Sequence, residues 1–228
     1  MKKILGCLPN LDKANGIASF FMNYLKSLNE FCELDFFLLE KIYDKEYYEL
    51  IMRQGKIYFA SSHNKLNKIK VISKDIKKIV AQNSYDYVHI NLVNIYAFSC
   101  FKGLKACNFQ NIIYHAHNPL NRGNIYFLCD ILNYYMINHS KKLIACTKEA
   151  GKSVFKKKEF QVIHNAIYAK DYIFDREFRL EFRKKYNLNE EFIMGNIARI
   201  EDQKNPIFVL KILKKLYKEN KTFKFFFI

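Results

Sequence analysis

The sequence predicts an α/β protein built on a doubly wound, Rossmann-like parallel sheet, followed by the first β-α-β unit of a second Rossmann-like domain. Short runs rich in β-branched and aromatic residues alternate with helical patterns from the first residue onward. The alternation leaves room for a helical crossover between successive strands, which parallel pairing requires. With 50% hydrophobic and 26% charged residues among its 228, the chain has the composition of a folded protein and not of a disordered tail.

The elements of the first domain are expected in regular order. Residues 2–8 form a strand, and residues 16–30 form a helix because their apolar side chains recur at helical spacing. These side chains are Ile17, Phe20, Phe21, Tyr24, Leu25 and Leu28. The same patterns then predict strands at residues 33–39, 56–60, 86–92, 111–115, 142–146 and 160–163, and helices at residues 66–81, 95–107, 125–138 and 148–155. Such an alternation indicates a parallel sheet covered on both faces.

The rhythm breaks after Ile167, where the first domain is expected to end. The elements predicted beyond it are a charged helix at 175–186, a strand at 192–198, a helix at 205–219 that opens with Asn205 and Pro206, and a strand at 222–228. The predicted organisation is a first domain at 1–167, a connection at 168–190 and the start of a second domain at 191–228. One β-α-β unit of under about 40 residues cannot bury a core by itself. We therefore expect the 228-residue chain to be incomplete and inactive on its own.

The net charge narrows the choice of partners. Lys and Arg number 38 against 22 Asp and Glu, which gives a formal charge of +16. This charge favours a phosphate-bearing ligand, an anionic membrane surface or nucleic acid, although a solvated lysine-rich surface would carry the same charge. No zinc-finger, RNA-recognition or clear helix-turn-helix pattern occurs, so nucleic acid is not expected as a partner.

The cysteines and the apolar runs indicate the compartment. Six cysteines occur without a C-x-x-C pair and lie within apolar runs, as reduced, buried thiols do. The longest apolar stretch beyond the amino terminus, residues 125–137, is interrupted by Asp130 and Asn133 and is too short and too polar to cross a bilayer. We therefore expect a cytoplasmic protein without a membrane span.

Candidate binding residues lie where the predicted strands end, because parallel sheets bind ligands outside the carboxyl ends of their strands. After the first strand, Asn15 and Gly16 could take left-handed dihedrals and bring backbone N–H groups to a ligand. No G-x-G-x-x-G dinucleotide motif is present in this loop. An ordinary loop with a helix cap is the alternative interpretation.

Two histidines mark the end of the fifth predicted strand. Strand alternation puts His115 and His117 on one face, and His117 lies nearest the carboxyl end, with Asn118 beside it. His117 is therefore the candidate catalytic residue, and Asn118 is a candidate substrate-binding residue. A third metal ligand is missing from the local sequence and no H-E-x-x-H or Cys-His cluster occurs, so no metal is expected.

Further polar residues follow the later strands. Thr147 is expected at a helix N-cap after the strand at 142–146, and Asn165 follows the last strand of the first domain. In the second domain Arg199 ends a strand and Lys204 begins a helix, so both cations lie on one loop. This arrangement suits a diphosphate, whose charges favour charge-assisted hydrogen bonds, while two solvated surface cations are the alternative.

Taken in order, these motifs resemble those of the retaining GT-B glycosyltransferases of the family-4 type, which use nucleotide-sugar donors in capsule, exopolysaccharide and lipid-linked sugar assembly. Residues 162–167 (VIHNAI) are similar to the V-I-P-N-G-I signature, and residues 198–205 (ARIEDQKN) to G-R-x-x-x-Q-K-N. Gly16, His117 and Thr147 match the glycine, histidine and Ser/Thr positions of earlier motifs. The sequence departs from the family at His164, Ala166 and Ala198, and its 228 residues contain neither the Gly-rich loop nor the E-x7-E segment of the second domain.

The resemblance implies transfer of a sugar with retained anomeric configuration. It implies that Arg199 and Lys204 bind the donor diphosphate and that His117 lies near the transferred sugar, while no cofactor or metal is required. Further candidate substrate-binding residues are Asn15, Gly16, Asn118, Thr147 and Asn165. The implied partners are a nucleotide-sugar donor and a lipid-linked or saccharide acceptor, at the inner face of the cell membrane.

A rival interpretation is a non-catalytic basic module that binds an anionic membrane surface. The charged helix at 175–186 and the consecutive lysines Lys156, Lys157 and Lys158 favour it.

Overall fold

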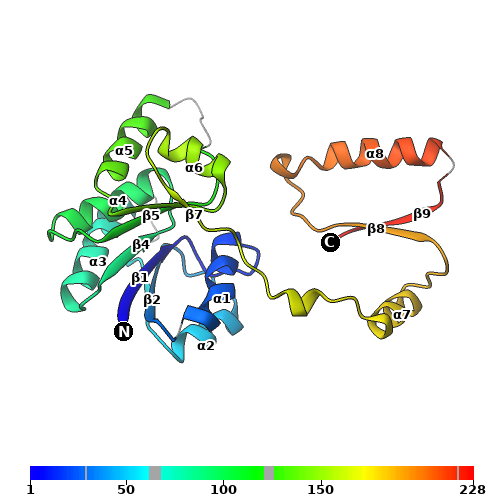
Figure 1. Ribbon diagram of the computed structural model, residues 1–228, viewed down its shortest axis with the longest axis horizontal. Coiled ribbons are helices and arrows are strands. Elements are labelled where there is room, and N and C mark those ends of the chain that lie inside the picture. Colours follow the sequence, from blue (N-terminus) through cyan, green and yellow to red (C-terminus); the bar gives the residue numbers. More distant parts are fainter. Residues whose placement is uncertain (29, 62–67, 121–125, 220) are drawn as a thin grey trace. The chain divides into compact units, whose positions relative to one another are not determined.

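The computed structural model describes residues 1–28, 30–61, 68–120, 126–219 and 221–228 (Figure 1). The chain divides into two compact units, Met1–Tyr168 and Ala169–Ile228, and each has its own sheet. Within these described ranges, no helix combines the length and the apolar character needed to cross a bilayer.

The first unit is built on a seven-stranded sheet with the order β3-β2-β1-β4-β5-β6-β7. Its strands are β1 (Lys2–Leu8), β2 (Cys32–Leu38), β3 (Ile57–Phe59), β4 (Tyr87–Ile90), β5 (Ile112–Ala116), β6 (Lys142–Ala145) and β7 (Gln161–Val162). Every pairing in the sheet is parallel, which confirms the predicted doubly wound α/β fold. β1 pairs with β2 on one side and with β4 on the other, so the direction of winding reverses at β1.

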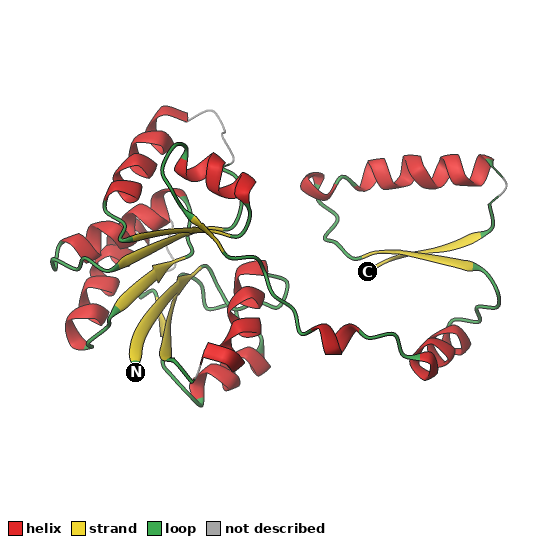
Figure 2. Ribbon diagram, in the orientation of Figure 1, coloured by secondary structure: helices red, strands yellow, loops and turns green. Residues whose placement is uncertain are grey.

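Helices cover both faces of this sheet (Figure 2). One face carries α1 (Gly16–Leu28) and α2 (Lys45–Met52); the other carries α3 (Lys68–Gln82), α4 (Asn94–Lys105), α5 (Tyr126–Asn138) and α6 (Lys148–Phe155). The residues at which the helices corresponding to α3 and α5 are expected to start, Leu66 and Ile125, lie outside the described residues.

The helix α2 is not among the predicted elements. It has eight residues, which is too short to produce a periodic pattern in a window of about 11 residues or more. The side chain of Asp44 starts the helix by accepting hydrogen bonds from the backbone N–H groups of Glu46 and Tyr47 at 3.0 and 3.2 Å. A local cap therefore supports an element that hydrophobic spacing does not reveal.

Two apolar clusters, one on each face of the sheet, form the core of the first unit. Phe37 of β2 belongs to the cluster under α3, α4, α5 and α6, whereas its neighbour Phe36 belongs to the cluster under α1 and α2. Because both faces are covered, the strands read as continuous apolar runs. The cysteines within described side chains are free thiols: Cys7, Cys32, Cys100, Cys107 and Cys146; the side chain of Cys129 lies outside them.

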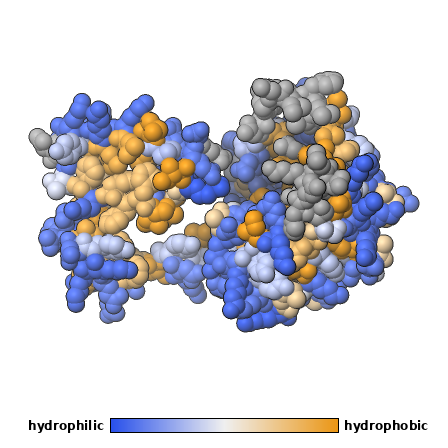
Figure 3. Space-filling model, turned by 180° about the vertical axis from the view of Figure 1, so that it is seen from behind, coloured by the Kyte–Doolittle hydropathy of each residue, from blue (hydrophilic) through white to orange (hydrophobic). Residues whose placement is uncertain are grey.

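The second unit contains one parallel strand pair with helices beside it. Its elements are η1 (Ala169–Tyr172), α7 (Arg176–Lys185), β8 (Phe192–Asn196), η2 (Asp202–Lys204), α8 (Pro206–Lys218) and β9 (Phe223–Phe227). The helix α7 packs on β9 through Phe182 and Tyr186, whose rings lie 5.8 and 5.5 Å from that of Phe226. Among the described residues of this unit only Leu188 is buried, and Figure 3 shows apolar side chains exposed on it.

Gly103 permits the close approach of α4 to α3. A Cβ atom at this position would overlap the backbone carbonyl oxygen of Ser73 and the Ile76 side chain. We predict that Gly103→Ala lowers the free energy of unfolding by about 1–3 kcal/mol, since the overlap outweighs the helix propensity of about 1 kcal/mol that alanine adds. Urea denaturation followed by circular dichroism measures the change.

The matched control is Gly16→Ala at the first residue of α1, where an added Cβ atom meets nothing within 4 Å. We expect this substitution to change the stability by no more than about 0.5 kcal/mol. Equal stabilities of the two variants would contradict the assignment of Gly103 to a close helix contact.

Candidate functional site

The candidate site lies where the winding of the sheet reverses. The loops that leave the carboxyl ends of β1 and β4 run to opposite faces, and a ligand crevice forms outside such a switch point in open α/β sheets. The polar side chains at this edge come from the ends of β4 and β5, and α1 covers them.

Three histidines share the face of the sheet that α1 covers. His89 lies in β4, His115 in β5 and His117 directly after β5. The Phe20 ring of α1 lies 5.0 Å from the ring of His115 and 5.4 Å from that of His117. The alternating neighbours Val88, Ile90, Tyr114 and Ala116 point into the opposite apolar cluster. Alternation therefore predicts correctly that His115 and His117 share one face, with ring centroids 4.0 Å apart.

Hydrogen bonds join His89 to His115 and His117 to Asn91. The Nε2 atom of His89 lies 3.1 Å from Nδ1 of His115, and Nε2 of His117 lies 2.8 Å from Oδ1 of Asn91. The Nε2 atom of His115 is buried and has no hydrogen-bond partner among the described residues. An orphaned ring nitrogen in the interior is uncommon, because desolvating it without a partner destabilises the fold.

Burial keeps all three imidazoles neutral at pH 7. It lowers the pKa of His117 to about 4 and that of His89 to about 3, and the nearby His117 ring adds to the effect on His89. Burial lowers the pKa of His115 further, and its two histidine neighbours add to the shift. The cluster therefore offers uncharged donors and acceptors, which suit hydroxyl groups better than anions.

The first predicted loop is organised differently from the expectation. Neither Asn15 nor Gly16 has a positive φ, so the prediction of left-handed dihedrals is wrong. Instead, the side chain of Asn15 accepts a hydrogen bond from the backbone N–H of Ile17 at 3.0 Å and donates one to Oδ1 of Asn10 at 2.9 Å. Because the side chain satisfies the start of the helix, α1 begins directly at Gly16, as the alternative of a capped loop had it.

Two other candidates follow β6 and β7. Thr147 is the N-cap of α6, with Oγ1 accepting from the backbone N–H of Ala150 at 3.1 Å. Asn165 is exposed in the loop after β7, and Asn118 is exposed after His117. Two hydrogen bonds hold the loop of Asn165 against α1. Tyr24 donates to the backbone carbonyl of His164 at 2.8 Å, and Asn23 donates to that of Ala166 at 2.7 Å.

Hydrogen bonds connect the exits of β5, β6 and β7. The thiol of Cys146 donates to the carbonyl oxygen of His117 at 2.8 Å, and Nδ1 of His164 lies 3.1 Å from the carbonyl oxygen of Cys146. Together with the bond from Tyr24, these contacts place the exits of His117, Thr147 and Asn165 around one edge of the sheet.

Sequence reasoning missed Asn91 and His89. The signal is present, since His89 and Asn91 have the same i, i+2 spacing at the end of β4 that His115 and His117 have at the end of β5. Comparing the two neighbouring strand ends would have revealed the pair.

Arg199 and Lys204 lie in the second unit, in the loop between β8 and α8. Arg199 pairs with Glu201, with Nη1 and Oε1 3.0 Å apart, and both cations are exposed. Asn205 adopts a φ of 49° and caps α8 by accepting from the backbone N–H of Phe208 at 3.2 Å, as predicted for this residue. The described side chains contain no group of three His, Cys, Asp or Glu residues placed to hold a metal ion.

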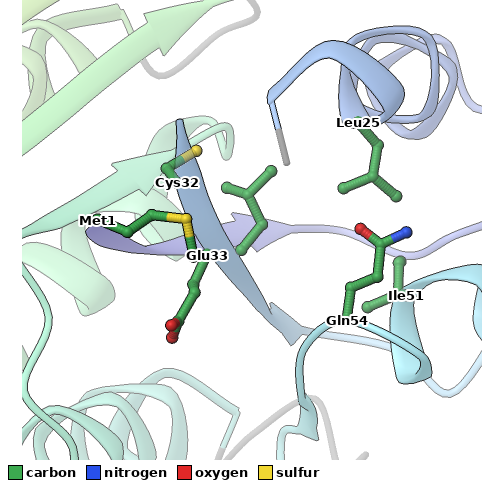
Figure 4. A pocket seen from close by; sticks show the side chains of 7 residues that line it. Met1, Leu25, Cys32, Glu33, Ile51 and Gln54 are labelled. Carbon is green, nitrogen blue, oxygen red and sulfur yellow. The ribbon is translucent and has the colours of Figure 1, made fainter. Parts of the chain in front are cut away.

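A separate cavity of about 300 Å³ lies at the amino ends of the strands, opposite the candidate site (Figure 4). Met1, Cys32, Glu33 and Leu25 are among the residues that line it, at the amino ends of β1 and β2. Since ligand sites of parallel sheets form at the carboxyl ends, we assign no function to this cavity.

The neutral histidines predict a loss of stability in mild acid. Their pKa values are lower in the folded state than in the unfolded state, near 6.5, so the unfolded chain binds more protons below pH 6.5. The contribution of the three histidines to the free energy of unfolding is complete above pH 6.5. It decreases by up to about 1.4 kcal/mol per pH unit for each histidine as the pH falls toward 4. Urea midpoints at pH 7.0, 6.0 and 5.0 measure this dependence.

The control for the acid effect is His117→Asn, which removes one of the three linked protons. We expect the slope of stability against pH to fall by about one third. Identical midpoints at pH 7.0 and 5.0 in the unsubstituted protein would show that the cluster is not buried and neutral.

Comparison with known proteins supports the fold. No protein-family model matches the chain, and no curated protein sequence matches it. A glycosyltransferase from Rickettsia africae superposes with a TM-score of 0.70 at 17% identity, covering 99% of this chain. The Anabaena protein HepE in complex with UDP and glucose gives 0.66 at 14% identity over 94% of this chain, and the Neisseria meningitidis UDP-GlcNAc 2-epimerase bound to UDP-GlcNAc gives 0.61 at 11% over 99%. The chain spans 60, 58 and 64% of the lengths of these three chains, and the likeness establishes a Rossmann-like fold of the GT-B kind.

Proposed function

We propose that this chain binds a nucleotide sugar and serves the transfer of its sugar to a lipid-linked acceptor of a surface polysaccharide, with retained anomeric configuration. The observation that carries the proposal is a doubly wound sheet with polar, uncharged side chains at its switch point, followed by a β-α-β unit with two cations on its first loop. Proteins of similar fold include one in complex with UDP and glucose and one described as a glycosyltransferase.

Each unit contributes a different part of the proposed chemistry. Arg199 and Lys204 bind the diphosphate beside the amino terminus of α8, where the helix dipole also favours anions. His117 contacts the transferred sugar, and Asn15, Gly16, Asn118, Thr147 and Asn165 are proposed to contact substrate around it. The two cations stabilise the departing diphosphate, so this reaction requires no metal or cofactor.

A second candidate function is the binding of an anionic membrane surface. A cavity of about 450 Å³ beside α5 and α6 is lined by apolar and basic side chains, among them Tyr134, Phe155 and Lys156 to Lys158. Asp130 and Asn133 also line it, and Asp130 pairs with Lys156 at 3.0 Å. Sedimentation with phosphatidylglycerol vesicles at low and high salt tests it. Binding that is independent of salt, or equal binding to phosphatidylcholine vesicles, would remove this candidate.

Titration calorimetry of the 228-residue chain with UDP, UDP-glucose, UDP-GlcNAc and ADP-glucose tests the leading proposal. We expect binding of at least one nucleotide sugar, and mass spectrometry of the mixture identifies any product. The proposal would be wrong if none of a panel of nucleotide sugars bound. Epimerisation of UDP-GlcNAc would identify the chain as part of an epimerase instead.

We predict that Arg199→Ala and Lys204→Ala each weaken nucleotide binding by at least about tenfold, because each removes a charge-assisted hydrogen bond to phosphate. Calorimetry with UDP measures both changes. The control is Lys214→Ala, which removes an exposed lysine of α8 remote from the loop and should leave the affinity unchanged. Equal affinities in all three variants would mean that Arg199 and Lys204 are solvated surface cations that do not bind the phosphates.

We predict that His117→Ala weakens the binding of UDP-glucose but not that of UDP, because His117 is proposed to contact only the sugar. Arg199→Ala should weaken both. His115 is 1% exposed, so His115→Ala should instead lower the thermal midpoint of the protein. A large loss of stability in His117→Ala with unchanged selectivity for UDP-glucose would make His117 a structural core residue.

A further inference from the structure

The Asn91 side chain connects the end of β4 to His117. Its Nδ2 atom donates a hydrogen bond to the backbone carbonyl oxygen of His89 at 3.0 Å, and its Oδ1 atom lies 2.8 Å from Nε2 of His117. Because a backbone carbonyl only accepts, the first bond fixes which end of the amide faces each partner. Asn91 is 1% exposed, so water has little access to its side-chain amide.

This orientation determines where His117 carries its hydrogen. The Oδ1 atom of Asn91 only accepts, so Nε2 of His117 must be the donor. Burial lowers the pKa of His117 to about 4, so the ring is neutral at pH 7 and carries one hydrogen. The Nδ1 atom is consequently a free acceptor, and the described residues supply no hydrogen bond to it.

The ring of His117 is also held in orientation. Cys146 binds the backbone carbonyl of His117, the Phe20 ring packs edge-on against the imidazole at 5.4 Å, and the ring of His115 lies 4.0 Å away. These contacts restrict rotation of the His117 ring. The ring therefore has little freedom to exchange the positions of its two nitrogens.

We propose that Asn91 is a positioning residue that holds His117 as the Nε2–H tautomer and so presents Nδ1 as a hydrogen-bond acceptor for a hydroxyl group of the ligand. The ligand part of this inference rests on the proposed function, in which the hydroxyl belongs to a sugar. The tautomer part concerns the free protein and stands on the two bonds of Asn91 alone.

Nuclear magnetic resonance of the full chain with ¹⁵N-labelled histidine tests the tautomer directly. At pH 7 we expect the pattern of a single Nε2–H form for His117, assigned by its loss in His117→Asn. Asn91→Leu keeps the approximate size of the side chain but removes the acceptor, and it should produce a measurable fraction of the Nδ1–H form. An unchanged Nε2–H pattern in Asn91→Leu would overturn the proposal.

A second variant keeps the test decisive should Asn91→Leu fail to fold. Asn91→Asp retains the acceptor and adds a negative charge, so it should keep the Nε2–H form and raise the pKa of His117 by about 1–3 units. The titratable groups that contact His117 are His115 and Cys146, with His89 behind His115, and none of them changes in this variant. A pKa that stays at its original value would show that residue 91 does not contact the ring.

Asn133 provides a matched control for general effects on the fold. It is 2% exposed, its Oδ1 accepts from the hydroxyl of Tyr114 and its Nδ2 donates to the carbonyl of Val154, so it repeats the bonding of Asn91 away from the histidines. Asn133→Ala should lower stability but leave the tautomer of His117 unchanged. A change of tautomer in this control would mean that the ring responds to loosening of the fold and would overturn the specific role of Asn91.

The ligand part is tested separately by calorimetry with UDP-glucose and UDP. Asn91→Leu should reduce the preference for UDP-glucose and leave the affinity for UDP unchanged. If the tautomer changes as expected but no nucleotide binds the unsubstituted protein, the proposed function fails and the positioning role survives. If nucleotides bind but the tautomer is unaffected by Asn91→Leu, the positioning role fails alone.

Discussion

Parallel pairing on both sides of β1 is the constraint on which the first unit depends. Since β1 hydrogen-bonds to β2 along one edge and to β4 along the other, the chain must wind outward in two directions. Right-handed crossovers then place α1 and α2 on one face and α3 to α6 on the other. The loops after β1 and β4 separate as a result, and the carboxyl ends of β4 and β5 come to the same edge under α1. The histidine cluster exists because of this topology.

The histidine cluster makes the fold less stable than a purely apolar arrangement would. Three imidazoles occupy positions where the alternating neighbours are aliphatic or aromatic, and Nε2 of His115 has no partner among the described residues. A buried, unsatisfied polar atom destabilises a fold by about 1–3 kcal/mol. Polar side chains in apolar surroundings are characteristic of functional sites. Here the pair His89 and Asn91 lies beside the pair His115 and His117, so these side chains gather at the switch point of the sheet.

Hydrophobic spacing predicts most of the framework, because the first unit buries both faces of its sheet. The helix α6 and the first strand occur at the expected residues, and Thr147 and Asn205 act as helix caps as expected. The helix α2 is not predicted, because a helix cap and not hydrophobic periodicity supports it. Asn91 is not predicted for a different reason. Its role depends on β4 and β5 being neighbours, with Val88 opposite Ile112, so this contact between residues 26 positions apart emerges only when the two strand ends are compared.

The two units differ in the kind of polar group that they present. In the first unit His115 is buried and His89 and His117 are half-buried, and all three are neutral at pH 7, so they can bond uncharged hydroxyls without requiring a counter-ion. In the second unit Arg199 and Lys204 are exposed cations next to the start of α8, where the backbone also favours negative charge. A nucleotide sugar combines an anionic diphosphate with a neutral ring of hydroxyls. Reversing the arrangement, with cations in the apolar cluster under α1, would require burying unpaired charge, which proteins avoid. Under the proposed function, the desolvation that keeps His117 neutral therefore suits it to the sugar hydroxyls and not to the diphosphate.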